Sequence, residues 1–498
     1  MAHRKISRFI PRDQKWLIAC LIAVSSVDSV ARLTTSKTQL VGYDSSLMGS
    51  LNVMPSYSSY FTLTTTTKSL NTAISYVGGA AISPLAGFLA DWRGRRECVF
   101  WSALVTLIGG VIQGTAQNIG MFIAGRCIVG AGMGLAQTTA PTLVAETTPV
   151  KYRGFALGMY YACWGRGTLI AAGVCFGTQK LDSTYAWRIP SVLQAAPSFV
   201  CFLILLFVPE SPRWLISHDR HEEALEVLSI VNGGDADDVQ VQYREIADTI
   251  NFEKEHSLGL VQAICKKSSR KRLLITTTFS AIVMLPGTNI ITFYFGEMLQ
   301  NAGIQSPNTQ LQINVILTSW SLVIAVVSAW YTDLLGRRQL CSASLALQAA
   351  FIFIFGAFTK LYGESTNTSG IYATIAIIFL YNGAYSWGIT PLTVLYPPEI
   401  LSFEIRGVGM GIYTFATKCC GLLVTMAVPF GLQAIGWKFY MVNGCFDVLM
   451  LVFVIFAWVE TRGLSLEEVD ELFDKEKREV VAVQVHAETK VDIQHKEC

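Results

Sequence analysis

The stretch "GFLADWRGRR" at residues 87–96 decides the fold, because its charged end returns in the second half of the chain. "DWRGRR" at 91–96 recurs as "DLLGRR" at 333–338, and "ETTPVKYRG" at 146–154 recurs as "EILSFEIRG" at 399–407. "PESPR" at 209–213 is echoed by "VETRG" at 459–463. The three pairs keep one order and a separation of about 250 residues, which indicates the kind of duplication that builds many transporters.

Long apolar runs fill both halves of the chain. Hydrophobic residues make up 52% of the 498 residues and charged residues 15%, whereas a soluble protein carries about 25% charged residues. A run of about 20 apolar residues can cross a bilayer as a helix. We expect eleven such spans, at 69–90, 98–118, 119–145, 154–176, 188–208, 273–300, 310–332, 339–359, 370–396, 407–434 and 437–459, and a twelfth between Lys15 and Lys68.

The distribution of charge divides the chain into five parts. We expect a cytoplasmic N-terminus at 1–15, a six-helix bundle at 16–208, a cytoplasmic helical linker at 209–272, a second six-helix bundle at 273–459 and a cytoplasmic tail at 460–498. Lysine and arginine gather in alternate loops, as they do in loops that stay in the cytoplasm. Both termini are therefore expected in the cytoplasm. The sequon at Asn367 is then a glycosylation candidate in an outward loop.

Composition also excludes several classes of function. The twelve cysteines are scattered without the spacing of a metal site, and the six histidines lie in polar segments. No nucleotide-binding motif is present. We therefore expect neither an enzyme nor a bound metal or cofactor. A net charge of +2 predicts no nucleic-acid partner.

Four further motifs make a family resemblance specific: "GRCIVGAGMG" at 125–134, "PESPRW" at 209–214, "YPPEILSFEIRG" at 396–407 and "VETRGLSLEEVDELF" at 459–473. With the repeated motifs, they resemble the sugar porters of the major facilitator superfamily, close to the fungal hexose and lactose-permease-like members. The resemblance implies an all-α membrane protein with twelve transmembrane helices in two pseudo-symmetric six-helix bundles. It also implies a monomer in the bilayer of the plasma membrane.

The function implied by the resemblance is secondary active import of a sugar or sugar-like solute by alternating access, with proton symport. Two alternatives stay open, namely export of a small metabolite and a nutrient sensor built on a transporter scaffold. The chain has acidic residues beside basic ones at the cytoplasmic ends of both halves. In the family such residues form a charge network that latches the inner gate, although ordinary anchoring by basic loops is the alternative. The candidates are Asp91, Arg95, Arg96, Glu146, Arg153, Asp333, Arg337, Arg338, Glu399 and Arg406.

Asp44 in "GYDSS" and Arg126 in "GRC" are candidates for proton coupling. A carboxylate at membrane depth is costly and is expected to face a cavity or a partner. In proton-coupled sugar porters, an aspartate of the first span lies beside an arginine of the fourth, which lowers the proton affinity of the acid. The alternative is a static structural ion pair.

The resemblance implies substrate contacts only in part. Asn289, Phe293 and Tyr294 match family positions in span 7, and Tyr161 stands where the family has a glutamine in span 5. Val283 and Met284 replace two adjacent glutamines, and Val394 replaces a tryptophan, so plain glucose transport is in doubt.

Arg166 and Lys418 are expected near the bilayer centre, since each lies about twelve residues into its span at about 1.5 Å per residue. One hypothesis is an anion site for a sugar acid. The alternative is pairing with a nearby acid or carbonyl group, or snorkelling toward the interface.

The polar segment 27–39 interrupts the first span. Without it, "KWLIACLIAVSS" would continue directly into "LVGYDSSLMGSLNVM" as one span. We hypothesise that the segment is a short intron read as coding sequence, in which case a translated insert would leave the chain inactive. A genuine insertion that makes the first span discontinuous is the alternative.

Overall fold

The computed structural model describes residues 39–147, 150–206, 208–231, 236–256, 267–363, 365, 367–401, 405–462, 469 and 473. Within these ranges the side chains at 145, 150–162, 231, 236–238, 252–256, 267–268, 329–334, 394 and 406–408 are not described. The described residues form helices joined by short turns, with no strand among them. Nine of the described helices are long and apolar enough to cross a membrane.

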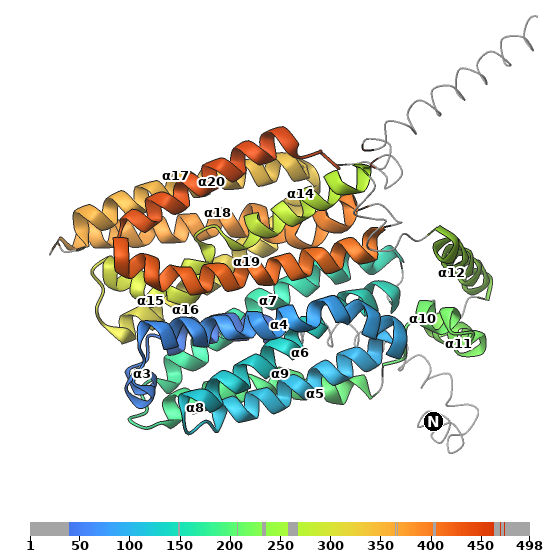
Figure 1. Ribbon diagram of the computed structural model, residues 1–498, viewed down its shortest axis with the longest axis horizontal. Helices are drawn as coiled ribbons and strands as arrows, with labels where there is room; N and C mark the ends of the chain where they lie inside the picture. The colour runs from blue at the N-terminus through green and yellow to red at the C-terminus, as the bar shows by residue number, and fades with distance from the viewer. Residues whose placement is uncertain are drawn as a thin grey trace, which may run out of the picture.

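The N-terminal half is a bundle of long helices that lie alongside one another (Figure 1). Residues 39–51 are helical. Gln39, the last residue of the suspected insert, is the first described residue of this helix, and residues 27–38 lie outside the described residues. The following helices are α3 (Pro55–Phe61), α4 (Thr65–Arg93), α5 (Arg95–Gly114), α6 (Ile119–Thr147), α7 (Val150–Thr178), α8 (Tyr185–Leu193) and α9 (Ala195–Leu205).

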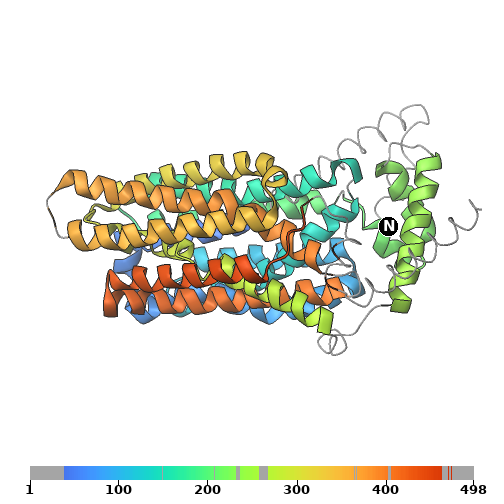
Figure 2. The ribbon, with the colours of Figure 1, turned by 90° about the horizontal axis from the view of Figure 1, so that it is seen from above.

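The C-terminal half repeats this plan after a short helical linker. The linker helices α10 (Pro212–Ser217), α11 (His221–Val231) and α12 (Ala236–His256) project beyond one end of the bundle, as Figure 2 shows. The second bundle contains α14 (Lys267–Met284), α15 (Thr288–Asn301), α16 (Pro307–Leu335), α17 (Arg337–Tyr362), α18 (Thr368–Ile400), α19 (Arg406–Ile435) and α20 (Lys438–Ala457). Each apolar run from 69–90 onward lies largely on helix in the described residues, and the predicted all-α fold class is confirmed.

Two expected spans are discontinuous. The run 188–208 divides into α8 and α9, and the run 273–300 divides into α14 and α15 at residues 285–287. Pro286 explains the second break, because proline has no backbone N–H and its ring disfavours a helical conformation at the preceding residue. The break leaves helical carbonyl groups without their usual partners at membrane depth, so other side chains must supply donors.

The repeated motif of the opening stretch forms the same turn in both halves. Gly94 between α4 and α5 has φ +103°, and Gly336 between α16 and α17 has φ +85°, a region that favours glycine. A Glu carboxylate from the paired motif fills the space beside each glycine. Glu210 accepts the backbone N–H of Arg96 at 3.0 Å, and Glu460 accepts the backbone N–H of Arg337 at 2.7 Å. Each carboxylate thus caps a helix N-terminus, where negative charge is stabilising.

Gly94→Ala is expected to lower the free energy of unfolding by about 1–3 kcal/mol, the typical cost of a non-glycine residue in a disfavoured backbone region. The new Cβ would also stand only 2.4 Å from Glu210 Oε2. Thermal unfolding of the purified protein in detergent measures the effect. Gly87→Ala is the control, because no atom lies within 4 Å of its Cβ position. Equal midpoints for the two variants would contradict this account of the turn.

Candidate transport site

A buried ion pair connects three elements of the N-terminal half. Arg126 of α6 is 0% exposed and Asp44 of the helix 39–51 is 4% exposed. Arg126 Nη1 donates to Asp44 Oδ1 at 2.9 Å and Nη2 donates to Oδ2 at 3.3 Å. Gln194, between α8 and α9, adds a third donor to Asp44 Oδ1 at 2.6 Å. A carboxylate with three donors is well compensated for its loss of water.

The other donors of Arg126 are directed to α4. Nε donates to the backbone carbonyl of Asn71 at 2.7 Å, and Nη2 also donates to Ser75 Oγ at 3.3 Å. Arg126 therefore connects Asp44 to α4, a helix that packs against α19 of the other half of the protein.

Three side chains satisfy the carbonyl groups at the break between α14 and α15. Tyr385 of α18 donates its hydroxyl to Val283 O at 3.0 Å, and Asn443 of α20 donates Nδ2 to Leu285 O at 3.0 Å. Asn289 of α15 donates Nδ2 to Met284 O. The break is thus a fixed structure, held by donors from three helices, and it places the start of α15 beside a pocket.

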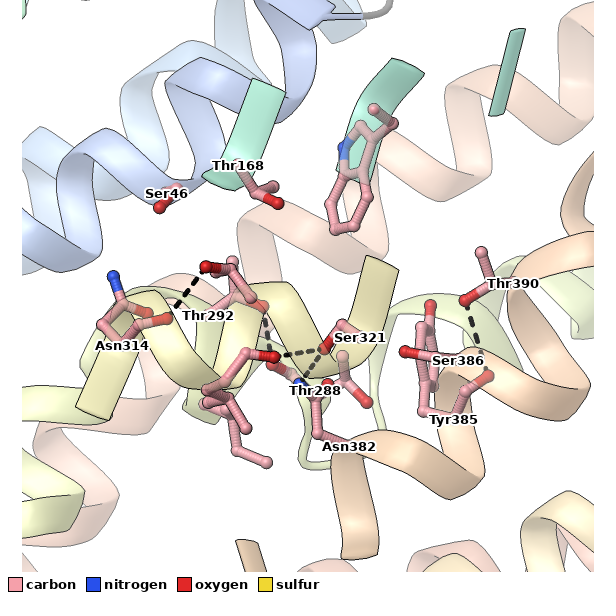
Figure 3. A pocket seen from close by; sticks show the side chains of 14 residues that line it. Ser46, Thr168, Thr288, Thr292, Asn314, Ser321, Asn382, Tyr385, Ser386 and Thr390 are labelled. Atoms are coloured by element: carbon pink, nitrogen blue, oxygen red, sulfur yellow. Dashed lines mark hydrogen bonds between the residues drawn. The ribbon is translucent and has the colours of Figure 1, made fainter. Parts of the chain in front are cut away.

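The pocket lies between the two halves, with about 510 Å³ of space (Figure 3). Most of the residues that line it carry a hydroxyl or amide group, Trp164 supplies an aromatic ring, and none of them is charged. The helix 39–51 and α7 line one side, and α15, α16 and α18 the other. The lining residues are Ser46, Trp164, Thr168, Thr288, Ile291, Thr292, Asn314, Leu317, Thr318, Ser321, Asn382, Tyr385, Ser386 and Thr390.

This wall has the composition of a site for a neutral, polyhydroxylated molecule. Several hydroxyls are already positioned by their own helix: Thr318 Oγ1, for example, donates to Asn314 O at 2.9 Å, which leaves its lone pairs as acceptors. Asn382 Nδ2 donates to Ser321 Oγ and so joins α18 to α16 along one side of the pocket.

None of the substrate contacts expected from the sequence is among the lining residues of this pocket. Asn289 holds the helix break instead. Phe293 is buried against Tyr76, with ring centroids 6.1 Å apart, and Tyr294 donates its hydroxyl to Thr425 O at 2.7 Å. The side chain of Tyr161 lies outside the described residues.

The two charges expected near the bilayer centre also lie away from the pocket. Trp164 and Thr168, one turn apart on α7, line it, so Arg166 stands on the opposite face of the helix, where it is exposed. Lys418 of α19 is 9% exposed and packs against α4, with Nζ 5.8 Å from the centre of the Tyr76 ring. The hypothesis that these two residues form an anion site is not supported by this arrangement.

Contacts between the halves are found toward the end of the bundles opposite the linker helices α10–α12. Lys68 Nζ of α4 pairs with Glu297 Oε1 of α15 at 2.6 Å, and Gln179 Nε2 donates to Asn308 Oδ1 at 2.7 Å. A Cβ on Gly49 would lie only 2.2 Å from Thr292 O, so the helix 39–51 touches α15 directly. This end of the pocket is therefore closed.

The ends of α4 and α19 that lie toward the linker helices are farther apart. Near the membrane centre, Tyr76 of α4 packs on Gly421 of α19. Gly87 lies three turns beyond Tyr76 on the same face, and Gly411 lies two turns from Lys418. Neither Gly87 nor Gly411 has an atom within 4 Å of its Cβ position. The arrangement is that of a carrier whose pocket opens toward the end that bears the linker helices α10–α12.

The expected gate residues form matching clusters, one in each half. In the first, Arg95 pairs with Asp91 at 3.0 Å and with Glu146 at 3.3 Å. Ser211 Oγ also donates to Glu146. Burial raises the pKa of the Glu210 carboxyl above its usual range, although backbone N–H groups of Arg96 and Ser211 act against this rise.

In the second cluster, Arg337 pairs with Glu399 at 3.0 Å, and Thr461 Oγ1 donates to Glu399 at 2.7 Å. Arg338 donates its backbone N–H to Glu460 and its side chain to Ile455 O. The side chains of Arg153, Asp333 and Arg406 lie outside the described residues. Sequence reasoning missed Glu210, Ser211, Glu460 and Thr461, although the echo between "PESPR" and "VETRG" marks these four positions.

Asn367 lies outside the transport site, at the start of α18. Its Oδ1 accepts the backbone N–H groups of Ser369 at 3.1 Å and Gly370 at 3.3 Å, which makes it a helix cap. The residue is exposed, and its glycosylation stays a prediction.

The sequence profile described as "Sugar (and other) transporter" matches residues 30–473. This chain belongs to the sugar transporter family. This transporter is therefore not an enzyme, and it is a multi-pass membrane protein. Among its relatives, the MFS glucose transporter mfs1 of Aspergillus flavus is 28% identical over 466 residues, which cover 87% of each chain. The major myo-inositol transporter IolT of Bacillus subtilis is 28% identical over 459 residues, with 90% of this chain and 95% of the relative covered.

Other relatives include a proton symporter and solved structures. The arabinose-proton symporter of Bacillus subtilis is 29% identical over 410 residues, with 80% of this chain and 85% of the relative covered. The inward-open conformation of the xylose transporter XylE from E. coli superposes with a TM-score of 0.74 at 22% identity. It covers 90% of this chain and 100% of the XylE chain, and it shows the shared fold.

Cysteine labelling tests the opening toward the cytoplasm. In a background without native cysteines, Gly411→Cys is expected to react with a membrane-impermeant maleimide added from the cytoplasmic side, because its position faces open space. Ser50→Cys is the matched control, since Ser50 is 0% exposed beside Asn314 and is expected to resist the reagent from either side. Equal labelling of the two positions would contradict the inward-facing assignment.

Proposed function

We propose that this transporter imports a neutral sugar or polyol together with a proton, by alternating access of one central pocket to the two sides of the membrane. The pocket carries the proposal: its wall offers hydroxyl and amide groups from both halves, a tryptophan ring and no charged side chain. Sugars and polyols present many hydroxyl groups, each of which donates and accepts hydrogen bonds. A sugar acid would leave a carboxylate without a cationic partner among the lining residues, at a large desolvation cost.

The proposed coupling site is the pair of Asp44 and Arg126. Asp44 lies two residues before Ser46, which lines the pocket, so the helix 39–51 carries both the proton-binding group and a wall of the site. Protonation of Asp44 would weaken its bidentate ion pair with Arg126. The hydrogen bonds from Arg126 to α4 would then change as well. Since α4 packs against α19, a proton at Asp44 can bias the position of one half relative to the other.

The charge clusters at the cytoplasmic end are the proposed inner latch. In this inward-facing structure Arg95 with Glu146 and Arg337 with Glu399 are each paired inside their own half. When the halves approach in the outward-facing state, these partly buried ion pairs, whose side chains are 11–23% exposed, would exchange partners between the halves so that no charge is left unpaired. We further infer a monomer in the plasma membrane, two six-helix domains at 16–208 and 273–459 joined by the cytoplasmic linker 209–272, and both termini in the cytoplasm.

An uptake panel tests the substrate class. Proteoliposomes or transporter-deficient cells are given radiolabelled neutral sugars, polyols and sugar acids, with and without a protonophore. Neutral sugars or polyols are expected to accumulate, and the protonophore is expected to abolish accumulation. Asn382→Ala is expected to raise KM by about tenfold, the loss of roughly one hydrogen bond's contribution. Arg166→Gln, on the outer face of the same region, is the control with unchanged KM. Preferred uptake of acids, or an effect of Arg166→Gln alone, would contradict the proposal.

Asp44→Asn tests the coupling. Asparagine keeps the shape of a protonated aspartate but cannot lose a proton, so uphill accumulation is expected to be abolished while exchange of labelled for unlabelled substrate continues. Asp182→Asn, which removes an exposed carboxylate between α7 and α8, is the matched control and should accumulate substrate normally. Normal accumulation by Asp44→Asn would show that the pair is only structural.

A further inference from the structure

Asp447 of α20 is a second carboxyl group buried at membrane depth. It is 0% exposed, and neither of its oxygen atoms has a hydrogen-bond partner in the described part of the chain. An isolated carboxylate in such surroundings is so costly that the group takes up a proton instead. This setting differs sharply from that of Asp44, which has three donors.

The surroundings of Asp447 contain further polar atoms without partners. Asn443 lies one turn before it on α20, and its Oδ1 is buried and unpaired. The hydroxyl of Tyr381 and Oγ1 of the pocket residue Thr288 are also buried, and they lie close enough to interact with each other. Tyr381 Oη and Asn443 Oδ1 meet at Gly287, where a Cβ would stand 3.0 Å from the first and 3.1 Å from the second.

These atoms gather at the break between α14 and α15. Asn443 Nδ2 caps Leu285 O there, and Thr288 begins α15 and lines the pocket. A protonated Asp447 has one O–H to donate, and Asn443 Oδ1, one turn away on the same face, is an acceptor that lacks a donor. An ionised Asp447 is an acceptor only and would attract the amide group of Asn443, which has two N–H groups and gives one of them to Leu285 O.

The charged groups of the neighbouring helices lie elsewhere. Phenol groups of α18 are the titratable groups close to Asp447, and Tyr381 is near enough to interact with it electrostatically. α17 presents apolar side chains to the adjacent Gly444, and α15 presents Gly287 and Thr288. Other charged groups on elements that pack against α20 include Lys360 of α17, over the Trp437 ring, and Lys418 of α19, against α4. Arg337 and Arg338 stand at the start of α17, where they bond Glu399 and Ile455 O, and Arg270, Lys271 and Arg272 lie at the start of α14.

We propose that Asp447 is a second proton-binding site of this transporter, and that the proton on Asp447 holds the break between α14 and α15 in its substrate-binding arrangement. The proposal rests on the proposed function for the identity of the substrate. Loss of the proton to water draws Asn443 away from Leu285 O, loosens the start of α15 and weakens the wall that contains Thr288, Ile291 and Thr292. The C-terminal half then responds to pH independently of Asp44 in the N-terminal half.

Infrared spectroscopy of the purified full-length protein tests the protonation directly. A C=O stretching band of a buried protonated carboxyl group is expected at neutral pH, and it should disappear as pH is raised. The band should be missing from Asp447→Asn and present in Asp44→Asn. Should Asp447→Asn fail to fold, Asp447→Glu is expected to keep the band at a shifted frequency. A wild-type spectrum without such a band, or a band unaffected by change at Asp447, overturns the proposal.

Equilibrium binding of the sugar or polyol found by the uptake panel tests the consequence. In the Asp44→Asn background, which removes the proton proposed for symport, Kd is expected to rise by about tenfold for each pH unit above the pKa of Asp447, because binding there requires one proton. The double variant Asp44→Asn, Asp447→Asn, which mimics the neutral form at both positions, should show no such rise. An equal rise in Asp44→Asn and in the double variant overturns the proposal.

The two tests separate this proposal from the proposed function. The infrared band needs no substrate, so its presence without uptake of any sugar or polyol would count against the proposed function alone. Absence of the band in a protein that accumulates sugar would count only against the role of Asp447 as a second proton-binding site.

Discussion

The ion pair between Asp44 and Arg126 is the interaction on which the rest of the site depends. Removal of two charges from water is costly, and here the cost is offset by bidentate geometry, by Gln194 and by two acceptors on α4. The pair therefore fixes the helix 39–51, α4, α6 and the junction of α8 and α9 relative to one another. Because one member can take up a proton, the same interaction that stabilises the N-terminal half can also be switched.

The two halves share the same arrangement of helices but differ in the polar groups at their centres. Their cytoplasmic clusters match group for group: Arg95, Glu146 and Ser211 in the first correspond to Arg337, Glu399 and Thr461 in the second. In the membrane the N-terminal half contains a compensated ion pair, while the C-terminal half contains a broken helix held by neutral donors. The pocket lies between the half that contains the ion pair and the half that contains the broken helix.

The fold could be predicted from sequence because apolar runs, basic loops and a repeated motif each report a strong physical constraint. Pairing of Asp44 with Arg126 was also predictable, since neither charge is tolerated alone in a membrane. The pocket was not predictable. Its hydroxyl residues are common in membrane helices, and whether Thr168 or Arg166 faces the pocket depends on the rotation of α7. The sequence predicts Asn289 as a substrate contact, whereas its amide donates to Met284 O. The sequence does not show which carbonyl groups the Pro286 break leaves without partners, so this bond could not be predicted.

Simultaneous measurement of sugar and proton flux tests the central claim most directly. Proteoliposomes with a pH-sensitive dye inside are given a transported neutral sugar on the outside, with no initial pH gradient. The account predicts that sugar entry acidifies the lumen, with a constant ratio of protons to sugar across substrate concentrations. Sugar entry without any change of internal pH would contradict it.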